Sequence, residues 1–525
     1  MIASASTIES QAAEILRTLP ARISEVVAPW AESSPDSPAL VEVSGTWTYR
    51  QLASAISATQ GRLRNCGVRP GDRVMIVGEN CREFVAILLA AAGLDAWPVL
   101  VNANLSAPEI DQIRDHCGAR RVFYTTSVSP HAAEHARRHG AAIEEGDGLG
   151  SIGIGLLNES AEPEPLEASV TNRIGALIYT SGTTGLPKGV MLSHRNLLFL
   201  AAGSAKIRTL TADDRFYGIL PMSHAVGLSV VLLGSLLSGA ALYLSPHFDP
   251  MNARLTLERE RLTVILGAPA TFNQFLQYAK FRNVQSLKFP ALRIIASSGA
   301  QLHASTKSGT ESLFGMPLYN GYGVTECSPT IAQTRVEAPR ADTSIGPPFP
   351  GVEIKLVGAN RKPVPEGEAG ELWVRGPNVM KGYYRSPEET AAAIDEEGWF
   401  NTRDLARLDD GNLFIVGRTK DLIVRRGFNV YPAEVEAVLN AHPAVVQAGV
   451  IGRTIEGDEE VVAFIQALPD SRLTVSDFAE YAALHLAQYK RPSQIFLVPS
   501  MPLTPTGKVV KAELAKMLEN NLQSR

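Results

Sequence analysis

A glycine-rich polar segment, residues 179–189, constrains the fold of this chain more than any other part of its sequence. It reads Tyr-Thr-Ser-Gly-Thr-Thr-Gly-Leu-Pro-Lys-Gly and lies between two apolar stretches, Ile174–Tyr179 and Val190–Leu192. This pattern predicts two strands joined by a tight loop. The glycines let the backbone turn several N–H groups toward one point, and such a concavity binds anions. The hydroxyl groups and the Lys188 ammonium suit phosphate oxygens.

The segment is not a Walker A loop. That motif needs four residues between its first Gly and a Gly-Lys-Ser/Thr, whereas Gly189 and Val190 follow Lys188 here. A P-loop ATPase or kinase of that type is therefore disfavoured. The competing interpretation is an ordinary polar hairpin. Seven of the nine positions from Ser181 to Gly189 are Ser, Thr, Gly or Lys, and this density favours a phosphate-binding loop.

Further motifs follow in a fixed order along the chain. They are Asn320–Glu326, Thr402–Asp404, Gly417–Asp421, Arg426–Pro432 and Pro505–Lys508. Together with the first loop they resemble the signatures of the adenylate-forming superfamily. This superfamily includes acyl- and aryl-CoA synthetases, adenylation domains of peptide synthetases and firefly-type luciferases. The resemblance extends over about Thr171 to Lys511 and is closest to fatty acyl-CoA ligases.

The bulk composition is that of a globular enzyme. Its 525 residues are too many for one compact core, so at least two domains are expected. Hydrophobic residues make up 45% and charged residues 20% of the chain, which is ordinary for this class. The net charge of −5 comes without a basic block, so nucleic acid is not expected as a partner. Four cysteines without Cys-x-x-Cys spacing favour free thiols and a cytoplasmic location.

No signal peptide is expected, because the N-terminus lacks a basic start followed by an apolar core. Residues Ala225–Pro246 carry no charge and are long enough to span a bilayer. Glycines and serines interrupt this stretch, so a buried helix leading into a buried strand, Ala240–Leu244, is the preferred interpretation. We therefore expect no membrane span, while peripheral association with a membrane stays open.

The pattern of apolar residues predicts an α/β protein. Residues 9–40 are expected to be helical, and a strand pair should follow at Ala39–Val43 and Thr46–Tyr49. From Gln51 to Val101 helical and β patterns alternate, which predicts α/β layers with parallel sheets. The strand-rich segment Gly351–Arg375 predicts a small β subdomain.

A second unit of helices and strands begins after Arg418 and predicts a smaller α+β domain. We expect an N-terminal AMP-binding domain at residues 1–417, with the acid and ATP sites. A hinge at residues 418–421, centred on Lys420, should lead to a mobile C-terminal lid domain at residues 422–525. The resemblance implies that this lid carries the catalytic lysine.

The resemblance implies an ATP-dependent ligase that joins a carboxylic acid to AMP and then transfers the acyl group to the thiol of coenzyme A. The first step brings an anionic acid against a triphosphate, so it needs the positive charge of Mg²⁺ and a lysine. Glu326 is expected to bind the metal, and Lys508 to bridge the carboxylate and the α-phosphate. The residues implied as catalytic are Lys508, Glu326, Thr180 and His224.

The implied nucleotide site draws on most of these motifs. Asp404 should accept hydrogen bonds from both ribose hydroxyls, and Tyr322 should stack on the adenine. The complete set of nucleotide-binding residues comprises Thr180, Ser181, Gly182, Thr183, Thr184, Gly185, Lys188, Ser298, Gly299, Ala300, Asn320, Gly321, Tyr322, Gly323, Thr325, Asp404, Arg418, Asn429 and Lys508.

Three segments should line the acid pocket: His224–Leu232, Val264–Leu276 and Ser297–Leu302. Beyond His224 they contain no charged residue, and burying an unpaired charge costs several kcal/mol. Diacids and amino acids are therefore disfavoured. We expect a medium- or long-chain fatty acid, with benzoate- or 4-coumarate-type aryl acids as the alternative. The residues assigned to this pocket are His224, Ala225, Val226, Ala268, Phe272 and Gly299.

Arg425, Arg426 and Gly427 are expected to contact coenzyme A. Transfer to a carrier-protein thiol is an alternative, although the chain has no carrier domain with its attachment serine. A relative that only binds ligands is disfavoured, because Glu326, Asp404 and Lys508 are all retained. The residues before Lys508 also resemble the recognition pattern of bacterial protein acetyltransferases, so a lysine acetyltransferase is an expected partner. The acid, and the choice between monomer and homodimer, stay open.

Overall fold

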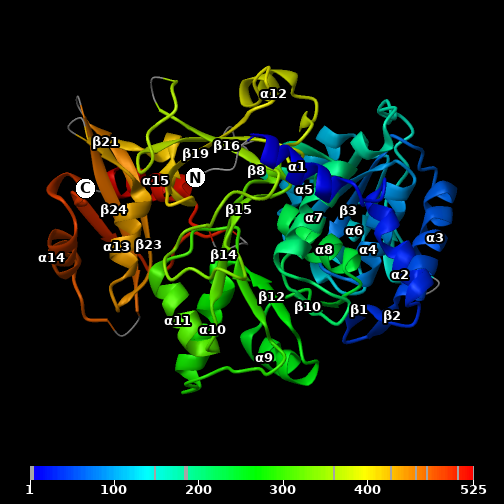
Figure 1. Cartoon of the computed structure of the whole chain (residues 1–525), viewed down its shortest axis with the longest axis horizontal. Helices are drawn as coiled ribbons and strands as arrows, with labels where there is room; N and C mark the ends of the chain where they lie inside the picture. The colour runs from blue at the N-terminus through cyan, green and yellow to red at the C-terminus, as the bar shows by residue number, and fades with distance from the viewer. Residues whose placement is uncertain are drawn as a thin grey trace.

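The computed structural model describes residues 5–146, 149–181, 187–358, 361–425, 428–455, 458–468, 471–504 and 508–523. A large N-terminal part of layered α/β structure is followed by a small β subdomain and a smaller C-terminal domain (Figure 1). The C-terminal domain, orange to red in Figure 1, lies beside the green segment that contains α10 (Pro269–Phe281), α11 (Ala304–Phe314) and β14 (Leu318–Gly323). The predicted fold class is confirmed.

The first large sheet has eight strands in the order β18-β9-β8-β4-β3-β5-β7-β6. Strand β3 pairs in parallel with β4 and β5, as the alternating pattern predicts, and β4 pairs in parallel with β8. The predicted strand pair around the glycine-rich loop is confirmed, because β8 and β9 are antiparallel neighbours. The strands are β3 (Arg73–Gly78), β4 (Trp97–Asn102), β5 (Arg121–Tyr124), β6 (Ala142–Gly146), β7 (Gly150–Ile154), β8 (Ile174–Ser181), β9 (Pro187–Ser193) and β18 (Gly382–Tyr383).

The second large sheet also has eight strands, in the order β15-β14-β13-β12-β10-β11-β1-β2. Its central strands are parallel, so their carboxyl ends meet at one edge, where α/β proteins place their ligands. The predicted hairpin near the N-terminus forms strands β1 and β2. Besides β14, the strands are β1 (Pro38–Glu42), β2 (Gly45–Thr48), β10 (Arg215–Gly218), β11 (Ala241–Leu244), β12 (Val264–Gly267), β13 (Ile294–Ser297) and β15 (Thr330–Gln333).

Helices cover the two sheets and pack on them through a large hydrophobic cluster and two smaller ones among the described residues. Helix α4 is buried over nearly its whole length, because its sequence is apolar on every side. The expected helix at residues 9–40 is instead three short pieces, because prolines at positions 20 and 29 prevent a continuous helix. The helices of this part are α1 (Ala5–Leu16), α2 (Ala28–Ser33), α3 (Tyr49–Asn65), α4 (Arg82–Gly93), α5 (Ala107–Cys117), α6 (Pro130–Arg138), α7 (His194–Ile207), α8 (Gly234–Leu237) and α9 (Pro250–Arg259).

The uncharged stretch after residue 224 is a buried helical segment that leads into strand β11, as predicted. Residues Val226–Leu233 form a π-helix, and its first turn packs on Pro221. A Cβ atom at Gly227 would lie 2.0 Å from the Pro221 carbonyl oxygen, so this close approach requires glycine. No helix among the described residues has the length and apolar character that a membrane crossing needs.

The predicted β subdomain is an antiparallel sheet in the order β16-β17-β19-β20, and α12 (Pro387–Ala393) precedes its third strand. Its strands are β16 (Glu353–Val357), β17 (Ala369–Arg375), β19 (Phe400–Asp409) and β20 (Asn412–Arg418). The C-terminal domain has its own hydrophobic clusters around a three-stranded sheet, which supports an independent unit. Its elements are β21 (Ile423–Arg425), β22 (Phe428–Val430), α13 (Pro432–Asn440), β23 (Val445–Ile455), β24 (Asp458–Ala467), α14 (Val475–His485), β25 (Gln494–Leu497) and α15 (Lys511–Gln523).

Candidate active site

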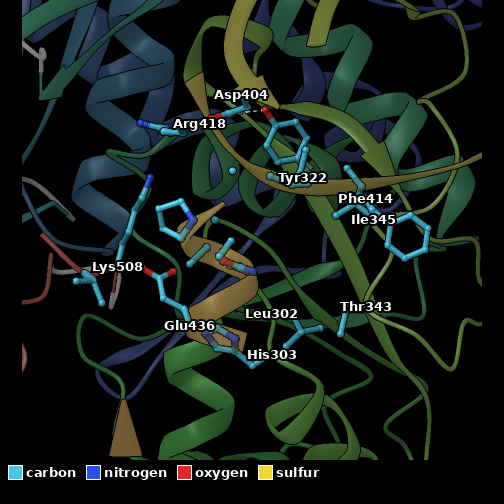
Figure 2. Close-up of a pocket in the computed structure, with 18 of the residues that line it drawn as sticks. Leu302, His303, Tyr322, Thr343, Ile345, Asp404, Phe414, Arg418, Glu436 and Lys508 are labelled. Atoms are coloured by element: carbon cyan, nitrogen blue, oxygen red, sulfur yellow. Dashed lines mark hydrogen bonds and ion pairs between the residues drawn. The ribbon is translucent and has the colours of Figure 1, made fainter. Parts of the chain in front are cut away.

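A cavity of about 260 Å³ lies where the second sheet, the β subdomain and the C-terminal domain meet. Its lining combines residues from the ends of β13 and β14, from β19 and β20, and from α13 and the segment before α15 (Figure 2). Nine residues predicted from the sequence to bind the nucleotide line it: Gly299, Ala300, Asn320, Gly321, Tyr322, Gly323, Asp404, Arg418 and Lys508.

Asp404 is the electrostatic centre of this cavity. The residue is only 3% exposed, and its carboxylate accepts hydrogen bonds from the Tyr322 hydroxyl and, at 2.8 Å, from Arg418 Nε (Figure 2). Burial raises the pKa of the Tyr322 hydroxyl, and the Asp404 charge raises it further, so the hydroxyl stays a donor. Each carboxylate oxygen has two lone pairs, so Asp404 retains acceptor capacity toward a ribose.

Lys508 enters the cavity from the C-terminal domain. Figure 2 shows its side chain extending along one wall toward Arg418. Its backbone N–H donates to Thr504 Oγ1 at 3.0 Å, which fixes the chain direction just before α15. Burial lowers the pKa of the ammonium, and the nearby Arg418 charge lowers it further. Within the part of the chain that the structure describes, the ammonium forms no ion pair, so an anionic ligand in the cavity meets an unneutralised cation.

The glycines and amides of the cavity wall have separate tasks. A Cβ atom at Gly299, whose φ is +90°, would point into open space, so this residue leaves the cavity mouth clear. At Gly323 a Cβ atom would lie 1.7 Å from the Pro329 carbonyl oxygen, so the β14 end requires glycine to approach that carbonyl. The Asn320 side chain donates to the Thr343 and Ser344 carbonyl oxygens at 3.1 and 3.3 Å. Asn320 therefore supports the wall through its amide N–H groups.

The expected phosphate-binding residues lie on the first sheet, and the expected metal ligand Glu326 lies in a short 3-10 helix that follows β14 of the second sheet. Lys188 Nζ is 2.5 Å from Glu389 Oε1, and the Tyr383 hydroxyl donates to Glu326 Oε1 at 2.8 Å. The backbone of Thr180 pairs with that of Lys188 across β8 and β9. Gly182, Thr183, Thr184 and Gly185, and the side chain of Ser181, lie outside the described residues. Of the other predicted contacts, Ser298 follows β13 and Thr325 begins a short 3-10 helix.

The donor set suits a magnesium ion that is held mainly by phosphate. Glu326 is a partly exposed carboxylate, and magnesium in ATP-dependent enzymes binds one or two carboxylates together with substrate phosphates and water. Among the described residues no group of three or more His, Cys, Asp or Glu side chains could hold a metal by itself. Glu326 therefore fits as the protein ligand of an ATP-bound magnesium ion.

His224 lies just before the π-helix, and its side chain retains solvent contact. Protein atoms nevertheless surround the imidazole closely enough to lower its pKa by desolvation. His224 does not line the cavity that contains Asp404 and Lys508. Ala225 and Ala268 are buried at 3% and 6% exposure, and Val226 is half-buried, so these three predicted residues offer only small surfaces to an acid.

The assignment of Phe272 to the acid pocket needs correction. Its side chain has 0% exposure and belongs to a hydrophobic cluster behind the second sheet, so it has no surface for an acid. Phe275, its neighbour on α10, is equally buried and packs edge-on against Phe248 and Phe314. The apolar pattern of α10 predicts burial, but it does not distinguish a core face from a pocket wall.

Asn80 was missed by the sequence analysis. It follows β3 of the first sheet, and its side chain forms hydrogen bonds with residues 218–222, at the end of β10 of the second sheet and just after it. Asn80 Nδ2 donates to the carbonyl oxygens of Gly218 and Leu220, each at 2.9 Å, and Oδ1 accepts from Met222 N–H at 2.9 Å. Three hydrogen bonds thus fix the chain immediately before His224. An asparagine at a strand end is the only signal that the sequence offers.

The predicted coenzyme A residues lie on the C-terminal domain. Arg425 Nη1 donates to the carbonyl oxygens of Tyr489 and Arg491 at 3.3 and 2.6 Å, so part of its guanidinium is used within the domain. Arg426, Gly427 and the side chain of Asn429 lie outside the described residues. Lys420 is exposed in a short 3-10 helix between β20 and β21, where the hinge is predicted.

A second missed contact joins the two domains beside the cavity, at His303 of its lining. His303, at the start of α11, has its Nε2 atom 3.3 Å from Asn440 Nδ2, at the end of α13. The Asn440 side chain is oriented by the Ala448 N–H, which donates to Oδ1 at 2.8 Å. Burial lowers the pKa of His303, which favours the neutral imidazole that can accept this bond.

A mixed α/β fold whose cavity gathers a buried carboxylate, an arginine and a lysine from a second domain defines an enzyme that binds a nucleotide. Residues 27–384 match the AMP-binding enzyme family, and residues 434–508 match the AMP-binding enzyme C-terminal domain. The chain belongs to the AMP-binding enzyme family, as the motifs predicted.

Two curated relatives and one solved structure show the activity. A feruloyl-CoA synthase from Amycolatopsis sp. is 34% identical over 490 residues, which are 93% of this chain and 97% of that protein. A CoA ligase from Mycobacterium tuberculosis, named for a propanoyl group that carries a methylated dioxo-octahydroindene ring system, is 32% identical over 521 residues, or 96% of this chain and 99% of that protein. The o-succinylbenzoate CoA synthetase of Bacillus subtilis, solved with ATP and a magnesium ion, has a TM-score of 0.80 at 28% identity and covers 94% of this chain and 99% of its own.

These similarities confirm the enzyme class predicted from the motifs. The protein is an acid–thiol ligase that works through an acyl-adenylate and uses ATP, magnesium and coenzyme A. The preference for a fatty acid is not supported to the same degree, because both relatives are named for acyl groups that carry rings.

Proposed function

We propose that this enzyme forms the CoA thioester of carboxylic acids in which a three-carbon arm carries an uncharged ring system. The observation that supports this acid class is a feature shared by two relatives. Feruloyl and the indenyl-substituted propanoyl group both have a ring on the third carbon of a propanoic or propenoic chain. The uncharged pocket segments suit such acids, because their only ionised group is the reacting carboxylate.

In the proposed first half-reaction, a carboxylate oxygen attacks the α-phosphorus of ATP, and the bond to pyrophosphate breaks. No proton is transferred, so the enzyme's task is to neutralise and position anions. The Lys508 ammonium faces this cavity without an ion pair to other described residues, and it can lie between the carboxylate and the α-phosphate. Asp404 and Tyr322 would hold the ribose and the base. Glu326 would hold the magnesium ion, which neutralises phosphate charge when bound.

In the proposed second half-reaction, the thiolate of coenzyme A attacks the acyl carbon, and the bond to AMP breaks. The proton of the thiol passes to solvent. This step needs a path for the pantetheine arm, for which Arg425, Arg426 and Gly427 stay the predicted contacts. The exposed Lys420 stays the predicted hinge. Rotation about it would turn a different face of the C-terminal domain toward the active site. The proposed boundaries remain 1–417, 418–421 and 422–525.

A fatty acid remains the second candidate, since an uncharged pocket also admits an alkyl chain. Each buried methylene adds about 0.8 kcal/mol, so activity on fatty acids would rise with chain length until the pocket floor is reached. Phe272 and Phe275 do not limit that length directly, because both are packed inside the core.

A matched set of acids tests the proposal. Ferulate, 3-phenylpropanoate, benzoate, hexanoate, dodecanoate and malonate are compared by kcat/KM for CoA-thioester formation. Ferulate against benzoate tests the length of the arm, and 3-phenylpropanoate against hexanoate tests the ring. We expect the two ring-bearing three-carbon acids to be preferred and malonate to be poorest. A maximum at dodecanoate would replace the proposal by the fatty-acid candidate, and a maximum at malonate would overturn the uncharged-pocket argument.

Two further expectations stay proposals. Lys508 acetylation by a protein lysine acetyltransferase would remove the charge that adenylation needs, because acetylation neutralises the ammonium. Mass spectrometry of the protein from its native host, grown on several carbon sources, tests this.

All four cysteines are unpaired, as a protein of a reducing compartment such as the cytoplasm would have them. The oligomeric state needs a direct measurement of mass in solution.

A further inference from the structure

Lys188, the cation at the end of the glycine-rich loop, has a carboxylate partner in this structure. Its Nζ atom lies 2.5 Å from Glu389 Oε1, on α12. The second oxygen of Glu389 accepts a hydrogen bond from Ser386 Oγ at 2.9 Å, so the carboxylate is oriented by its own helix. The Lys188 ammonium also lies 5.4 Å from the centre of the Tyr383 ring. The carboxylate therefore stands where a phosphate group of ATP is expected to meet Lys188.

The architecture holds α12 beside the loop. Strand β18, which directly precedes α12, pairs with β9, and Tyr383 lies opposite Val190. The N–H of Tyr383 donates to Thr390 Oγ1 at 2.9 Å, which ties β18 to α12. Lys188 and Glu389 are therefore brought together by the fold and not by a chance encounter of long side chains.

The ion pair between Lys188 and Glu389 is weak enough for a phosphate group to replace the Glu389 carboxylate. The side chains of Lys188 and Glu389 are 22% and 37% exposed, and ion pairs in such settings contribute little to stability. A hydrogen bond from Lys188 and its charge keep the pKa of the Glu389 carboxyl low, so the carboxylate stays ionised and competes for the ammonium. A triphosphate carries several negative charges against one on Glu389, so it displaces the carboxylate.

We propose that Glu389 is a positioning residue that competes with the phosphate groups of ATP for the Lys188 ammonium. Glu389 holds the ammonium at the loop before ATP binds, gives it up to the phosphates, and takes it back as pyrophosphate leaves. This inference rests on the proposed phosphate role of Lys188. It predicts that the carboxylate opposes phosphate binding, which is the reverse of what a merely structural ion pair would do.

The test replaces Glu389 by glutamine, which keeps the shape and an acceptor for Ser386 but removes the charge. Equilibrium binding of ATP and of pyrophosphate to the full-length protein should tighten about twofold to fivefold in Glu389→Gln. Product inhibition by pyrophosphate should increase by a similar factor. The matched control is Glu388→Gln, on the same helix and exposed, which should leave both affinities unchanged.

A double-mutant cycle separates this inference from the proposed function. In a Lys188→Met background, Glu389→Gln should no longer change ATP affinity, because the ammonium for which the carboxylate and the phosphates compete is absent. Unchanged or weaker ATP binding in Glu389→Gln, or an equal effect in both backgrounds, would overturn the exchange role. Loss of the phosphate role itself would appear separately, as normal ATP binding in Lys188→Met.

Discussion

The carboxylate of Asp404 and the ammonium of Lys508 belong to different domains and line the same cavity. Their charges attract each other, and Arg418 stands between them as a partner of Asp404 and a repulsive neighbour of Lys508. A nucleotide that placed its ribose at Asp404 and its α-phosphate at Lys508 would complete this charge arrangement. We therefore propose that this relative position of the domains is the one that serves the adenylation half-reaction.

Lys508→Ala should abolish acid-dependent pyrophosphate release but retain CoA-thioester formation from supplied acyl-AMP. The reason is that only the first half-reaction brings an acid carboxylate against a triphosphate, where an ammonium is needed. We expect a loss of at least about a hundredfold in the first assay and less than about threefold in the second. Lys516→Ala, an exposed position on α15, is the control. Equal losses in both assays would contradict the assignment.

Asn80→Ala should raise KM for the acid much more than KM for ATP. The substitution removes all three hydrogen bonds that fix residues 218–222, directly before His224. Leaving buried carbonyl and N–H groups without partners costs about 1–3 kcal/mol each, so the unfolding free energy should also fall. Steady-state kinetics with each substrate varied, together with urea unfolding, checks both effects. Asn65→Ala, at the exposed end of α3, should change neither.

A result in which both Michaelis constants rise equally would assign Asn80 to general stability alone. The distinction matters because Asn80 links the two large sheets. A positioning role requires that the effect be concentrated on the ligand nearest His224.

His194 should make the fold less stable as the pH falls from about 6.5 to about 4. This histidine is fully buried at the start of α7, and burial lowers its pKa to about 4. Between those values the unfolded chain binds a proton that the folded chain does not, so the unfolding free energy rises with pH in this window. The effect is on the order of 3 kcal/mol and is absent above the unfolded pKa.

Urea unfolding of the wild type and of His194→Asn at several pH values between 4 and 7 checks this prediction. The asparagine keeps an acceptor for the N–H of Ile23, which donates to His194 Nδ1 at 3.4 Å. The variant should lose the extra pH slope, and the exposed control His485→Asn should keep it. Identical slopes in wild type and His194→Asn would show that another group causes the acid sensitivity.

Much of the architecture followed from local sequence patterns. The apolar stretches around the glycine-rich loop predicted the pair β8 and β9, and the turn at Ser44-Gly45 predicted the first hairpin. The motif residues Asp404, Arg418 and Lys508 meet in one cavity, as the resemblance implied. These features were accessible because strand alternation, turn chemistry and short motifs are encoded by neighbouring residues.

The features that the sequence did not reveal depend on contacts between distant segments. Asn80 reaches the chain after β10, and Glu389 reaches Lys188 on β9, and neither contact has a local signature. Phe272 was assigned to the acid pocket because a buried apolar helix face looks the same whether it packs on a sheet or on a ligand. Only the three-dimensional packing separates these cases.

The most direct test of adenylate formation in this cavity is acid-dependent exchange of radiolabelled pyrophosphate into ATP, measured without coenzyme A. We expect exchange with ferulate that depends on magnesium and is lost in Lys508→Ala and Asp404→Ala. Addition of coenzyme A should then give feruloyl-CoA and AMP. Feruloyl-CoA formation without any such exchange, or exchange that persists undiminished in Lys508→Ala, would contradict an adenylate formed in this cavity.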